Sequence, residues 1–440
     1  MGSLESPHII LITCHDLGHH LGCYGVESVS APTMDALAAT GVRFERSFCV
    51  APQCSPSRAT LATGRYPHSN GVMGLSHGPF GWELNPDERH AASLFTQYGY
   101  ETHLFGLQHV TQHVERLGFD RVHSQGLGRE VAVEVATFLR GPLPENPLYI
   151  EINFFEPHRP YDHGGVEPDT SDGVVIPPYL PKDAAGHEEM AALQGAIREV
   201  DGAVGTILEA LDDSDISEST LLIFTVDHGI AMPRAKCTLY DPGLEIALIV
   251  RWPDGGIGEG RTVSELVSNV DVLPTLLEAA GAPIPSGTQG YSFLPLLRRE
   301  PYDARDAIYA EKTFHSYYDP MRCIRTERYK YVRNFEAGFL VEVPGDVQEG
   351  SIFRSHAQRY STDRPKGAEL YDLRADPLEQ NNLAGNVEFA GIEKELDTRL
   401  WSWMKDTGDP LLDGPVASPV YRRSLDDLPH RERSKPYRAR

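Results

Sequence analysis

Long hydrophobic runs are missing from this 440-residue sequence. Its longest apolar stretches cover residues 9–13, 221–226 and 246–250, whereas a membrane-spanning helix needs about 20 apolar residues. The amino-terminal segment MGSLESPHII also lacks the basic and apolar regions of a signal peptide. We therefore expect no membrane span. We expect a cytoplasmic protein as the sequence stands, or a periplasmic or secreted one if a leader has been removed.

Basic residues and cysteines are both scarce. Forty Lys and Arg residues oppose 63 Asp and Glu residues, which gives a formal charge of −23. A surplus of negative charge repels polyanions, so we expect no nucleic-acid partner, and an anionic substrate needs a locally positive pocket. Six cysteines without a C-x-x-C pair argue against a disulfide scaffold and a zinc ribbon. Cys54 alone lies in a context that indicates chemistry.

Strand-like and helix-like segments alternate through the first 300 residues. The sequence predicts buried strands at 8–13, 104–106, 148–154, 221–226 and 246–250, and helices at 32–40, 129–140, 188–211 and 272–280. Such alternation is typical of βαβ units, which form a mainly parallel sheet covered by helices on both faces.

The pattern changes after about residue 300. Short strands at 308–310, 321–326, 329–334 and 368–372, followed by a helix at 388–405, predict a small antiparallel sheet with one covering helix. We therefore predict a catalytic domain over 1–300 and a smaller subdomain over 301–414. Residues 415–440 are rich in Arg, Pro and Asp and predict an extended arm. The arm would wrap the body or a neighbouring subunit, and the second arrangement would give a homo-oligomer.

Polar side chains follow two of the predicted strands. His15 and Asp16 come after the first strand, and Asp227 and His228 come after the strand at 221–226. In α/β sheets, ligand sites form at the carboxyl ends of the strands. Carboxylates with an imidazole suit Ca²⁺, Mg²⁺ or Mn²⁺ better than a metal that prefers thiolates. Each aspartate alone could instead cap the next helix or turn.

The segment 51–72, APQCSPSRATLATGRYPHSNGV, carries the most specific pattern. Cys54, Pro56 and Arg58 form C-x-P-x-R, and L-A-T-G-R follows at 61–65. This stretch resembles the formylglycine motif of the type I sulfatases, a branch of the alkaline phosphatase superfamily. The alternative is a buried cysteine beside a buried arginine at a helix start. The resemblance implies an alkaline-phosphatase-like fold, in which helices flank a central mixed, mainly parallel sheet.

The resemblance also implies a reaction. A formylglycine-generating maturation enzyme would convert Cys54, and the aldehyde hydrate would attack sulfur to form a covalent sulfo-enzyme. Arg58 would hold this nucleophile at a helix N-terminus, where anions are favoured. The substrate would be a sulfate ester or N-sulfate of a carbohydrate or small metabolite. One divalent cation, calcium in first place with manganese or magnesium as alternatives, would be bound by Asp16, Cys54, Asp227, His228 and His15.

Further stretches similar to the family imply the remaining catalytic residues. His109, in the segment GYETHLFGLQH, corresponds to the histidine that contacts the hydroxyl of the nucleophile. His158 in E-P-H-R-P is the candidate proton donor to the leaving group, because an alkoxide or amide anion leaves poorly. Lys236 in K-C-T-L-Y would bridge the sulfate and the leaving oxygen. Asp227 would take the proton of the nucleophile.

Two departures from the family pattern keep a second reaction open. Leu107 occupies a position where the family usually has a lysine, and Asp227-His228 replaces the usual Asp-Asn pair. In having Asp227-His228, the chain resembles choline sulfatases and phosphonate monoester hydrolases. A phosphonate monoester or phosphodiester hydrolase is therefore an alternative. A catalytically inactive sulfo-glycan binding protein is another, although the intact motif residues argue against it.

Candidate substrate-binding residues come from two stretches. D-P-M-R at 319–322, near His315, resembles the heparan N-sulfatase (sulfamidase) branch of the family. Arg322 or His315 would then read a sugar carboxylate, with packing between domains as the alternative role for both. Arg159 would reach an acidic substrate or pair on the surface.

Overall fold

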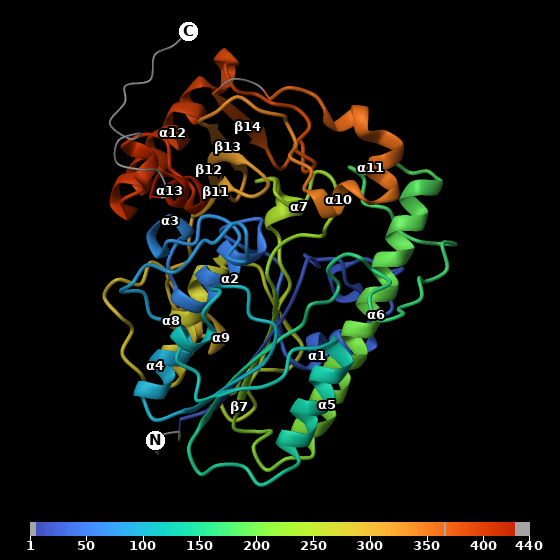
Figure 1. Ribbon diagram of the computed structural model, residues 1–440, viewed down its shortest axis with the longest axis vertical. Coiled ribbons are helices and arrows are strands. Elements are labelled where there is room, and N and C mark those ends of the chain that lie inside the picture. Colours follow the sequence, from blue (N-terminus) through green and yellow to red (C-terminus); the bar gives the residue numbers. More distant parts are fainter. Residues whose placement is uncertain (1–5, 365–366, 427–440) are drawn as a thin grey trace.

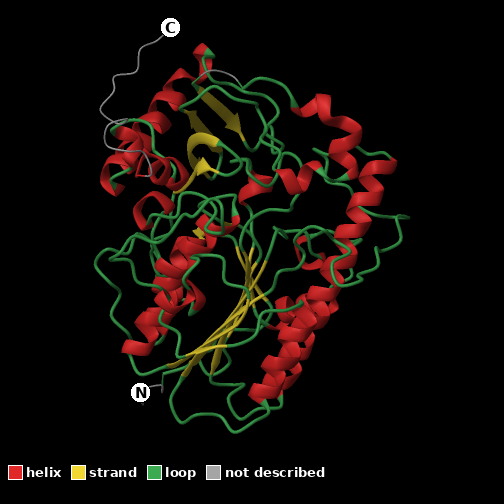
Figure 2. Cartoon of the chain, viewed as in Figure 1, coloured by secondary structure: helices red, strands yellow, loops and turns green. Residues whose placement is uncertain are grey.

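A central sheet between two layers of helices forms the larger part of the molecule, and a smaller sheet lies at one end (Figures 1 and 2). The computed structural model describes residues 6–364 and 367–426. Within these ranges, no helix combines the length and the apolar character that crossing a membrane would need.

The central sheet has eight strands in the order β5-β4-β6-β1-β7-β8-β2-β9. β1 lies between β6 and β7 and is parallel to both, whereas β8 is antiparallel to β7 and β2. The sheet is therefore mixed and mainly parallel, as predicted. Its strands are β1 (His8–Cys14), β2 (Val42–Phe44), β4 (Glu101–Gly106), β5 (Arg121–Val122), β6 (Leu148–Asn153), β7 (Thr220–Val226), β8 (Leu248–Arg251) and β9 (Arg261–Val263).

Helices cover both faces of this sheet because its central strands are apolar on both faces. Side chains alternate along a strand, so Ile10 and Ile12 of β1 join one hydrophobic cluster and Ile9 and Leu11 join another. The first cluster includes side chains of α1 (Pro32–Thr40), α5 (Gly128–Leu139) and α6 (Ala184–Asp212). The second includes side chains of α2 (Cys54–Thr63), α4 (Ala91–Gln97), α8 (Val272–Ala279) and α9 (Leu294–Leu297).

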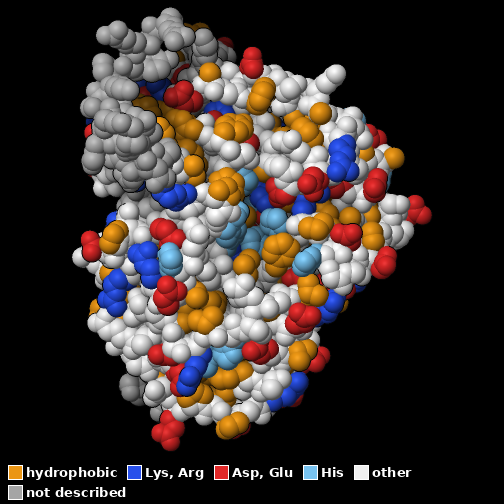
Figure 3. All heavy atoms as spheres, viewed as in Figure 1, with side chains coloured by type: hydrophobic (Ala, Val, Ile, Leu, Met, Phe, Trp, Pro, Cys, Tyr) orange, Lys and Arg blue, Asp and Glu red, His pale blue; other side chains and the backbone are white. Residues whose placement is uncertain are grey.

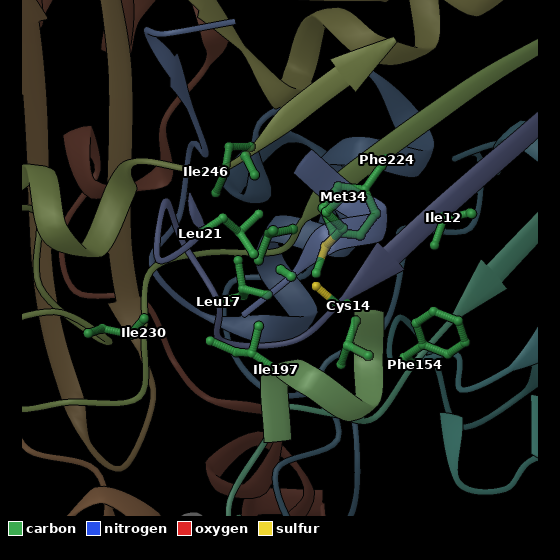
Figure 4. Close-up of a cluster of buried hydrophobic side chains, with 14 of the residues drawn as sticks. Ile12, Cys14, Leu17, Leu21, Met34, Phe154, Ile197, Phe224, Ile230 and Ile246 are labelled. Atoms are coloured by element: carbon green, nitrogen blue, oxygen red, sulfur yellow. The ribbon is translucent and has the colours of Figure 1, made fainter. Parts of the chain in front are cut away.

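Figure 4 shows part of the first cluster. Ile12 of β1 and Phe224 of β7 lie there with Met34 of α1 and Ile197 of α6. All four side chains are fully buried. The continuous apolar runs that predicted these strands therefore reflect a sheet buried between two helical layers.

The smaller sheet is an antiparallel meander. Its strands are β11 (Ala307–Phe314), β12 (Tyr318–Thr326), β13 (Tyr329–Asn334) and β14 (Ala368–Asp372). Leu400 and Trp403 of α12 (Ala390–Thr407) pack in one cluster with Ile324 and Leu370 of this sheet. The predicted sheet with one covering helix is confirmed. Between β13 and β14, the chain forms α10 (Gly345–Gln348) and α11 (Ser351–His356), and α11 contacts α6.

The carboxyl-terminal segment differs from the prediction. Residues Pro419–Asp426 form helix α13, so the expectation of an extended arm is wrong for this stretch. The backbone N–H of Val416 donates to the Tyr318 hydroxyl at 3.1 Å, and Arg423 Nη2 donates to the Pro79 carbonyl at 2.9 Å. These bonds attach the segment to the body of the same chain. The rest of the predicted arm, residues 427–440, lies outside the described residues.

Candidate active site

The carboxyl ends of β1, β6 and β7 meet at one edge of the central sheet. Thr13 of β1 pairs with Asn153 of β6 and with Thr225 of β7. The residues that follow these positions, Asp16 and Asp227 among them, consequently face one shared crevice. Asp16 adopts a left-handed backbone conformation with φ of +49°, a strained state that a non-glycine residue keeps only where its surroundings enforce it.

Two buried aspartates form the centre of the site. Asp16 and Asp227 are 0% and 1% exposed, and the Asp16 backbone N–H donates to Asp227 Oδ1 at 3.0 Å. His228 Nε2 lies 3.0 Å from Asp16 Oδ1, and His15 Nδ1 lies 2.9 Å from Asp227 Oδ2. Burial lowers the pKa of His15 to about 4, so this imidazole is neutral at pH 7 and can act as a ligand.

Cys54 is the first residue of α2, and every residue of that helix is buried. Its Sγ atom lies 3.3 Å from His228 Nε2, so the N-terminus of the helix is directed at the acidic centre. The positive end of the helix dipole therefore favours an anion there. Burial raises the pKa of the Cys54 thiol well above its ordinary value. The unmodified side chain thus stays a thiol at neutral pH and is a poor nucleophile.

Arg58 lies one helical turn after Cys54 and is held by three acceptors. Its Nε donates to Asp227 Oδ2 at 3.2 Å, its Nη1 to Asn153 Oδ1 at 3.1 Å and its Nη2 to the Cys14 carbonyl at 3.3 Å. The guanidinium group is therefore fixed in one orientation before any substrate binds. Sequence reasoning missed Asn153. Its signal was a polar residue at the carboxyl end of a predicted strand.

Lys236 connects the acidic centre to the carboxyl-terminal part of the chain. Its Nζ atom lies 2.9 Å from Asp16 Oδ2, 2.8 Å from Asp346 Oδ2 and 3.4 Å from His158 Nε2. Burial alone would lower the pKa of Lys236, but Asp16 and Asp346 outweigh burial and raise it well above its ordinary value. The lysine is therefore charged. Asp346, in α10, was missed because no sequence motif surrounds it.

Histidines line the opening of the site. His158 Nε2 is 3.8 Å from both Asp16 Oδ2 and Asp346 Oδ2, and burial together with Lys236 lowers the pKa of His158. His109 Nε2 lies 2.8 Å from Nδ1 of His77, which sequence reasoning also missed. Burial lowers the pKa of His109 well below its ordinary value. Figure 3 shows histidine side chains gathered in a hollow near the middle of one face, beside cationic and acidic side chains.

The acidic centre has the donor set of a divalent metal site. Ligand atoms of His15, Asp16, Cys54 and Asp227 lie within 4.8 Å of one another. Asp16 Oδ1 is buried and accepts no hydrogen bond from the described residues. A buried carboxylate oxygen that accepts no hydrogen bond is costly, and a bound cation would remove that cost. The residues present therefore fit a metal ion, with the ring of His228 next to the same oxygen.

The three candidate substrate-binding residues lie in different surroundings. Arg159 donates from Nε to the Ala231 carbonyl at 2.9 Å and pairs with Glu189. His315 is 9% exposed, with Nδ1 at 3.7 Å from Glu342 Oε1.

The position of Arg322 contradicts the expectation that it binds the substrate. It is completely buried, with Nη2 at 3.0 Å from Asp409 Oδ1 and 3.2 Å from Glu311 Oε2. Its guanidinium is therefore used in packing α12 and its following turn against the small sheet. This position does not fit a role in substrate binding.

Comparisons with known proteins agree with this geometry. Residues 7–282 match the family described as Sulfatase, and residues 233–350 match the family described as N-sulphoglucosamine sulphohydrolase, C-terminal. An ulvan-active sulfatase of Formosa agariphila is 31% identical over 430 residues, which cover 94% of this chain and 83% of that protein. Human N-sulphoglucosamine sulphohydrolase is 28% identical over 463 residues, covering 92% and 91% of the two chains.

A solved structure has the same fold as this chain. The phosphonate monoester hydrolase of Agrobacterium radiobacter superposes with a TM-score of 0.70 at 22% identity, covering 91% of this chain and 96% of that one. The expected alkaline-phosphatase-like fold is confirmed.

Proposed function

This chain belongs to the sulfatase family of sulfuric ester hydrolases, and we propose that it removes an O-sulfate or N-sulfate group from a saccharide. One observation carries the proposal. Cys54 lies at the buried N-terminus of α2, and its Sγ is 3.3 Å from a histidine that also contacts Asp16. The names of the two relatives, which refer to ulvan and to N-sulphoglucosamine, support a carbohydrate substrate.

We assign the metal to Asp16, Asp227 and His228, with Cys54 and His15 beside it. Oxygen ligands predominate, so calcium is the first choice, with manganese or magnesium as alternatives. When bound, the ion would neutralise sulfuryl oxygens, and Cys54 converted to formylglycine would supply the attacking hydroxyl. Asp227, which also contacts Arg58, would accept the proton of that hydroxyl.

Arg58 and His109 would serve the nucleophile side of the site. Arg58 is fixed by Asp227, Asn153 and the Cys14 carbonyl, so its positive charge needs no reorganisation when negative charge develops. The ring of His109 lies 5.8 Å from that of His15, measured between centroids. A neutral imidazole at this place could accept the proton of the second hydroxyl of the hydrate, whose C–O bond becomes the aldehyde C=O as sulfate leaves.

Lys236 and His158 would serve the leaving group. The two side chains are adjacent, at 3.4 Å between Nζ and Nε2. Lys236 is charged and can donate a hydrogen bond to the leaving oxygen. His158 has a lowered pKa in the free site, and the negative charge of a bound sulfate would raise that pKa and favour the protonated donor.

The proposal is tested with protein matured by a formylglycine-generating enzyme. Mass spectrometry of the peptide that contains Cys54 reports the conversion, and ion chromatography reports sulfate released from sulfated mono- and disaccharides. We expect converted protein to release sulfate from at least one saccharide, and unconverted protein to release none. Converted, metal-loaded protein that hydrolyses no saccharide sulfate would contradict the proposal.

A phosphonate monoester or phosphodiester hydrolase is the second candidate. His228 at the metal site and Leu107 at the usual lysine position favour it, because both reduce the resemblance to a typical sulfatase. Comparing kcat/KM for an aryl sulfate and an aryl phosphonate separates the two reactions. The third reading, an inactive sulfo-glycan binding protein, predicts a Cys54 that stays unconverted in a host with competent maturation enzymes.

A further inference from the structure

A large cavity adjoins the leaving-group side of the site. Its volume is about 750 Å³, within the range of about 300–1,000 Å³ that is usual for small-molecule sites. We propose that the saccharide part of the substrate binds here, and that the acidic lining selects neutral or amine-bearing saccharides over those that carry a second anion. This inference rests on the proposed sulfatase activity and adds the charge of the substrate to it.

Asp346 joins the cavity to the catalytic groups. The residue lines the cavity, and its Oδ2 atom is 2.8 Å from Lys236 Nζ and 3.8 Å from His158 Nε2. These two side chains are the ones assigned to the leaving group. The sulfate would lie toward Cys54 and the metal ligands, so the remainder of the substrate would extend past Asp346 into the cavity.

Carboxylates outnumber cations in the lining. Six acidic side chains and two arginines line the cavity, together with one histidine. Arg159 is already paired with Glu189, Asp169 is paired with Arg198, and Asp346 is paired with Lys236. The acidic lining residues are Asp162, Asp169, Glu188, Glu189, Asp346 and Glu349.

The unpaired groups in this set are also mainly acidic. Asp162, Glu188 and Glu349 are exposed and form no ion pair with any described residue. Of the two lining arginines, Arg354 also forms no ion pair in the described part of the chain. Carboxylates accept hydrogen bonds from sugar hydroxyls and bind an ammonium group strongly. A second sulfate or a sugar carboxylate would meet like charge instead.

This lining differs from the expectation that Arg322 or His315 reads a sugar carboxylate, since neither residue lines the cavity. Arg322 is buried in another part of the molecule, and Arg159 already has a carboxylate partner. Among the described lining residues, Arg354 is the one arginine without a carboxylate partner, and three unpaired carboxylates lie around the same space.

The test uses three probes that differ in charge at one position of the sugar. Glucosamine 6-O-sulfate carries an ammonium group at C2, N-acetylglucosamine 6-O-sulfate is neutral there, and glucosamine 2-N,6-O-disulfate is anionic. We expect kcat/KM for 6-O-desulfation to decrease in this order, by about fivefold from the neutral to the anionic probe at low salt. If the N-sulfate is the group removed, kcat/KM for N-sulphoglucosamine should exceed kcat/KM for the disulfate by a similar factor.

Charge-reversal variants locate the effect in the cavity. Glu188→Lys and Glu349→Lys should each reduce the neutral-to-anionic ratio of kcat/KM by about threefold or more, because each changes the local charge by two. Glu300→Lys makes the same change at an exposed residue that does not line the cavity, and should leave the ratio unaltered. Thermal unfolding of each variant verifies that it is folded.

The possible results separate this inference from the proposed function. If matured protein hydrolyses none of these or other saccharide sulfates, the proposed function fails. If it hydrolyses them but prefers the anionic probe, or if Glu300→Lys changes the ratio as much as the cavity variants do, only the inference fails.

Discussion

The charge on Lys236 depends on two carboxylates that come from distant parts of the chain. Asp16 follows β1, and Asp346 belongs to α10 in the other half of the sequence. Each lies within 3 Å of the lysine Nζ, at 2.9 Å and 2.8 Å. A metal ion bound to Asp16 would compete with Lys236 for that carboxylate, so Asp346 would be the residue that keeps Lys236 protonated and positioned in the loaded site.

Asp346→Asn should reduce kcat/KM about 10- to 100-fold, which corresponds to the loss of one hydrogen bond between charged groups. Because Asp346 raises the pKa of Lys236, the variant should also lose activity at a lower alkaline pH than the parent protein. Rate measurements from pH 6 to 10 test this, with Asp346→Glu as the conservative variant. A uniform decrease without a shifted pH profile would indicate a purely structural role.

Cys54→Ala should abolish turnover and leave the fold intact, since it removes one sulfur atom from a buried position. Cys49→Ala is the matched control, because Cys49 is also buried in the core and its Sγ atom makes a long S–H···O contact of 3.7 Å with the Gly243 carbonyl. Both variants should lose about 1 kcal/mol of stability, and only Cys49→Ala should keep activity. Turnover by Cys54→Ala at a level near the parent would refute the nucleophile assignment.

His20 should make the stability of the protein dependent on pH. The side chain is buried, its Nε2 atom has no hydrogen-bond partner among the described residues, and burial lowers its pKa to about 4. An unfolded histidine titrates near 6.5, so the unfolded state binds more protons between pH 6.5 and 4. The contribution of His20 to the free energy of unfolding should therefore be fully present above about pH 6.5 and decrease by about 1.4 kcal/mol per pH unit from there to about pH 4.

Urea unfolding at pH 7 and pH 5 measures this contribution. In the parent, the free energy of unfolding should decrease from pH 7 to pH 5. In His20→Leu this decrease should be about 2 kcal/mol smaller. His113→Leu removes an exposed histidine and should leave the difference unchanged. An equal pH effect in the parent and in His20→Leu would exclude His20 as its source.

At the scale of the elements, the site depends on the turn that follows β7. The backbone N–H of Gly229, directly after Asp227-His228, donates to the Gly243 carbonyl at 3.0 Å. A Cβ atom at Gly229 would lie 1.9 Å from the Pro242 carbonyl oxygen and 2.9 Å from Gly243 Cα. Both neighbours are backbone atoms, so no side-chain rotation can make room for even a methyl group.

Gly229→Ala should therefore displace the Asp227-His228 turn, lower the unfolding temperature and weaken metal binding. Gly202→Ala provides the contrast, because Gly202 lies inside α6 and a Cβ there meets no atom within 4 Å. That change should stabilise the protein by up to about 1 kcal/mol. Thermal unfolding without calcium measures the stability of each variant. The increase in unfolding temperature on adding calcium measures metal binding. A Gly229→Ala protein with normal calcium stabilisation would show that the turn tolerates the methyl group.

At the scale of the molecule, a buried ion network joins the small sheet to the catalytic part. The Nζ atom of Lys330, in β13, lies 2.6 Å from both Asp241 Oδ1 and Glu379 Oε1. Arg325, in β12, has its Nη2 atom 2.9 Å from Asp241 Oδ2. Asp241 begins α7 (Asp241–Leu244), just after the Lys236 segment. The small sheet is therefore attached close to Lys236, and Asp346 of α10, which lies between β13 and β14, contacts the same lysine.

Lys330→Met should destabilise the protein by about 3–5 kcal/mol, because it leaves buried carboxylates without their cation. Arg374→Met breaks an ion pair with Glu327 in which both side chains are 62% exposed, and should cost less than about 1 kcal/mol. Denaturant unfolding followed by both fluorescence and activity measures the two values. A Lys330→Met protein as stable as Arg374→Met would mean that the network contributes nothing to the attachment of the sheet.

The sequence by itself determined the local features of this protein. Apolar runs located the central strands, the helix at Pro32–Thr40 and the strands Tyr329–Asn334 and Ala368–Asp372 were predicted with their observed bounds, and the motif around Cys54 indicated the chemistry. These features depend on residue types and spacing over a few positions. The sequence also indicated that Asp16 and Asp227 converge, because parallel strands end at one edge of a sheet.

Only the tertiary structure decided the contacts between distant segments. Asp346 lies 110 positions after Lys236, no local pattern marks it, and its proximity results from the packing of α10 beside the segment that carries Lys236. The burial of Arg322 likewise depends on Asp409, which is 87 positions away. Such contacts are decided by how complete elements pack, and side-chain periodicity carries no information about the partner across an interface.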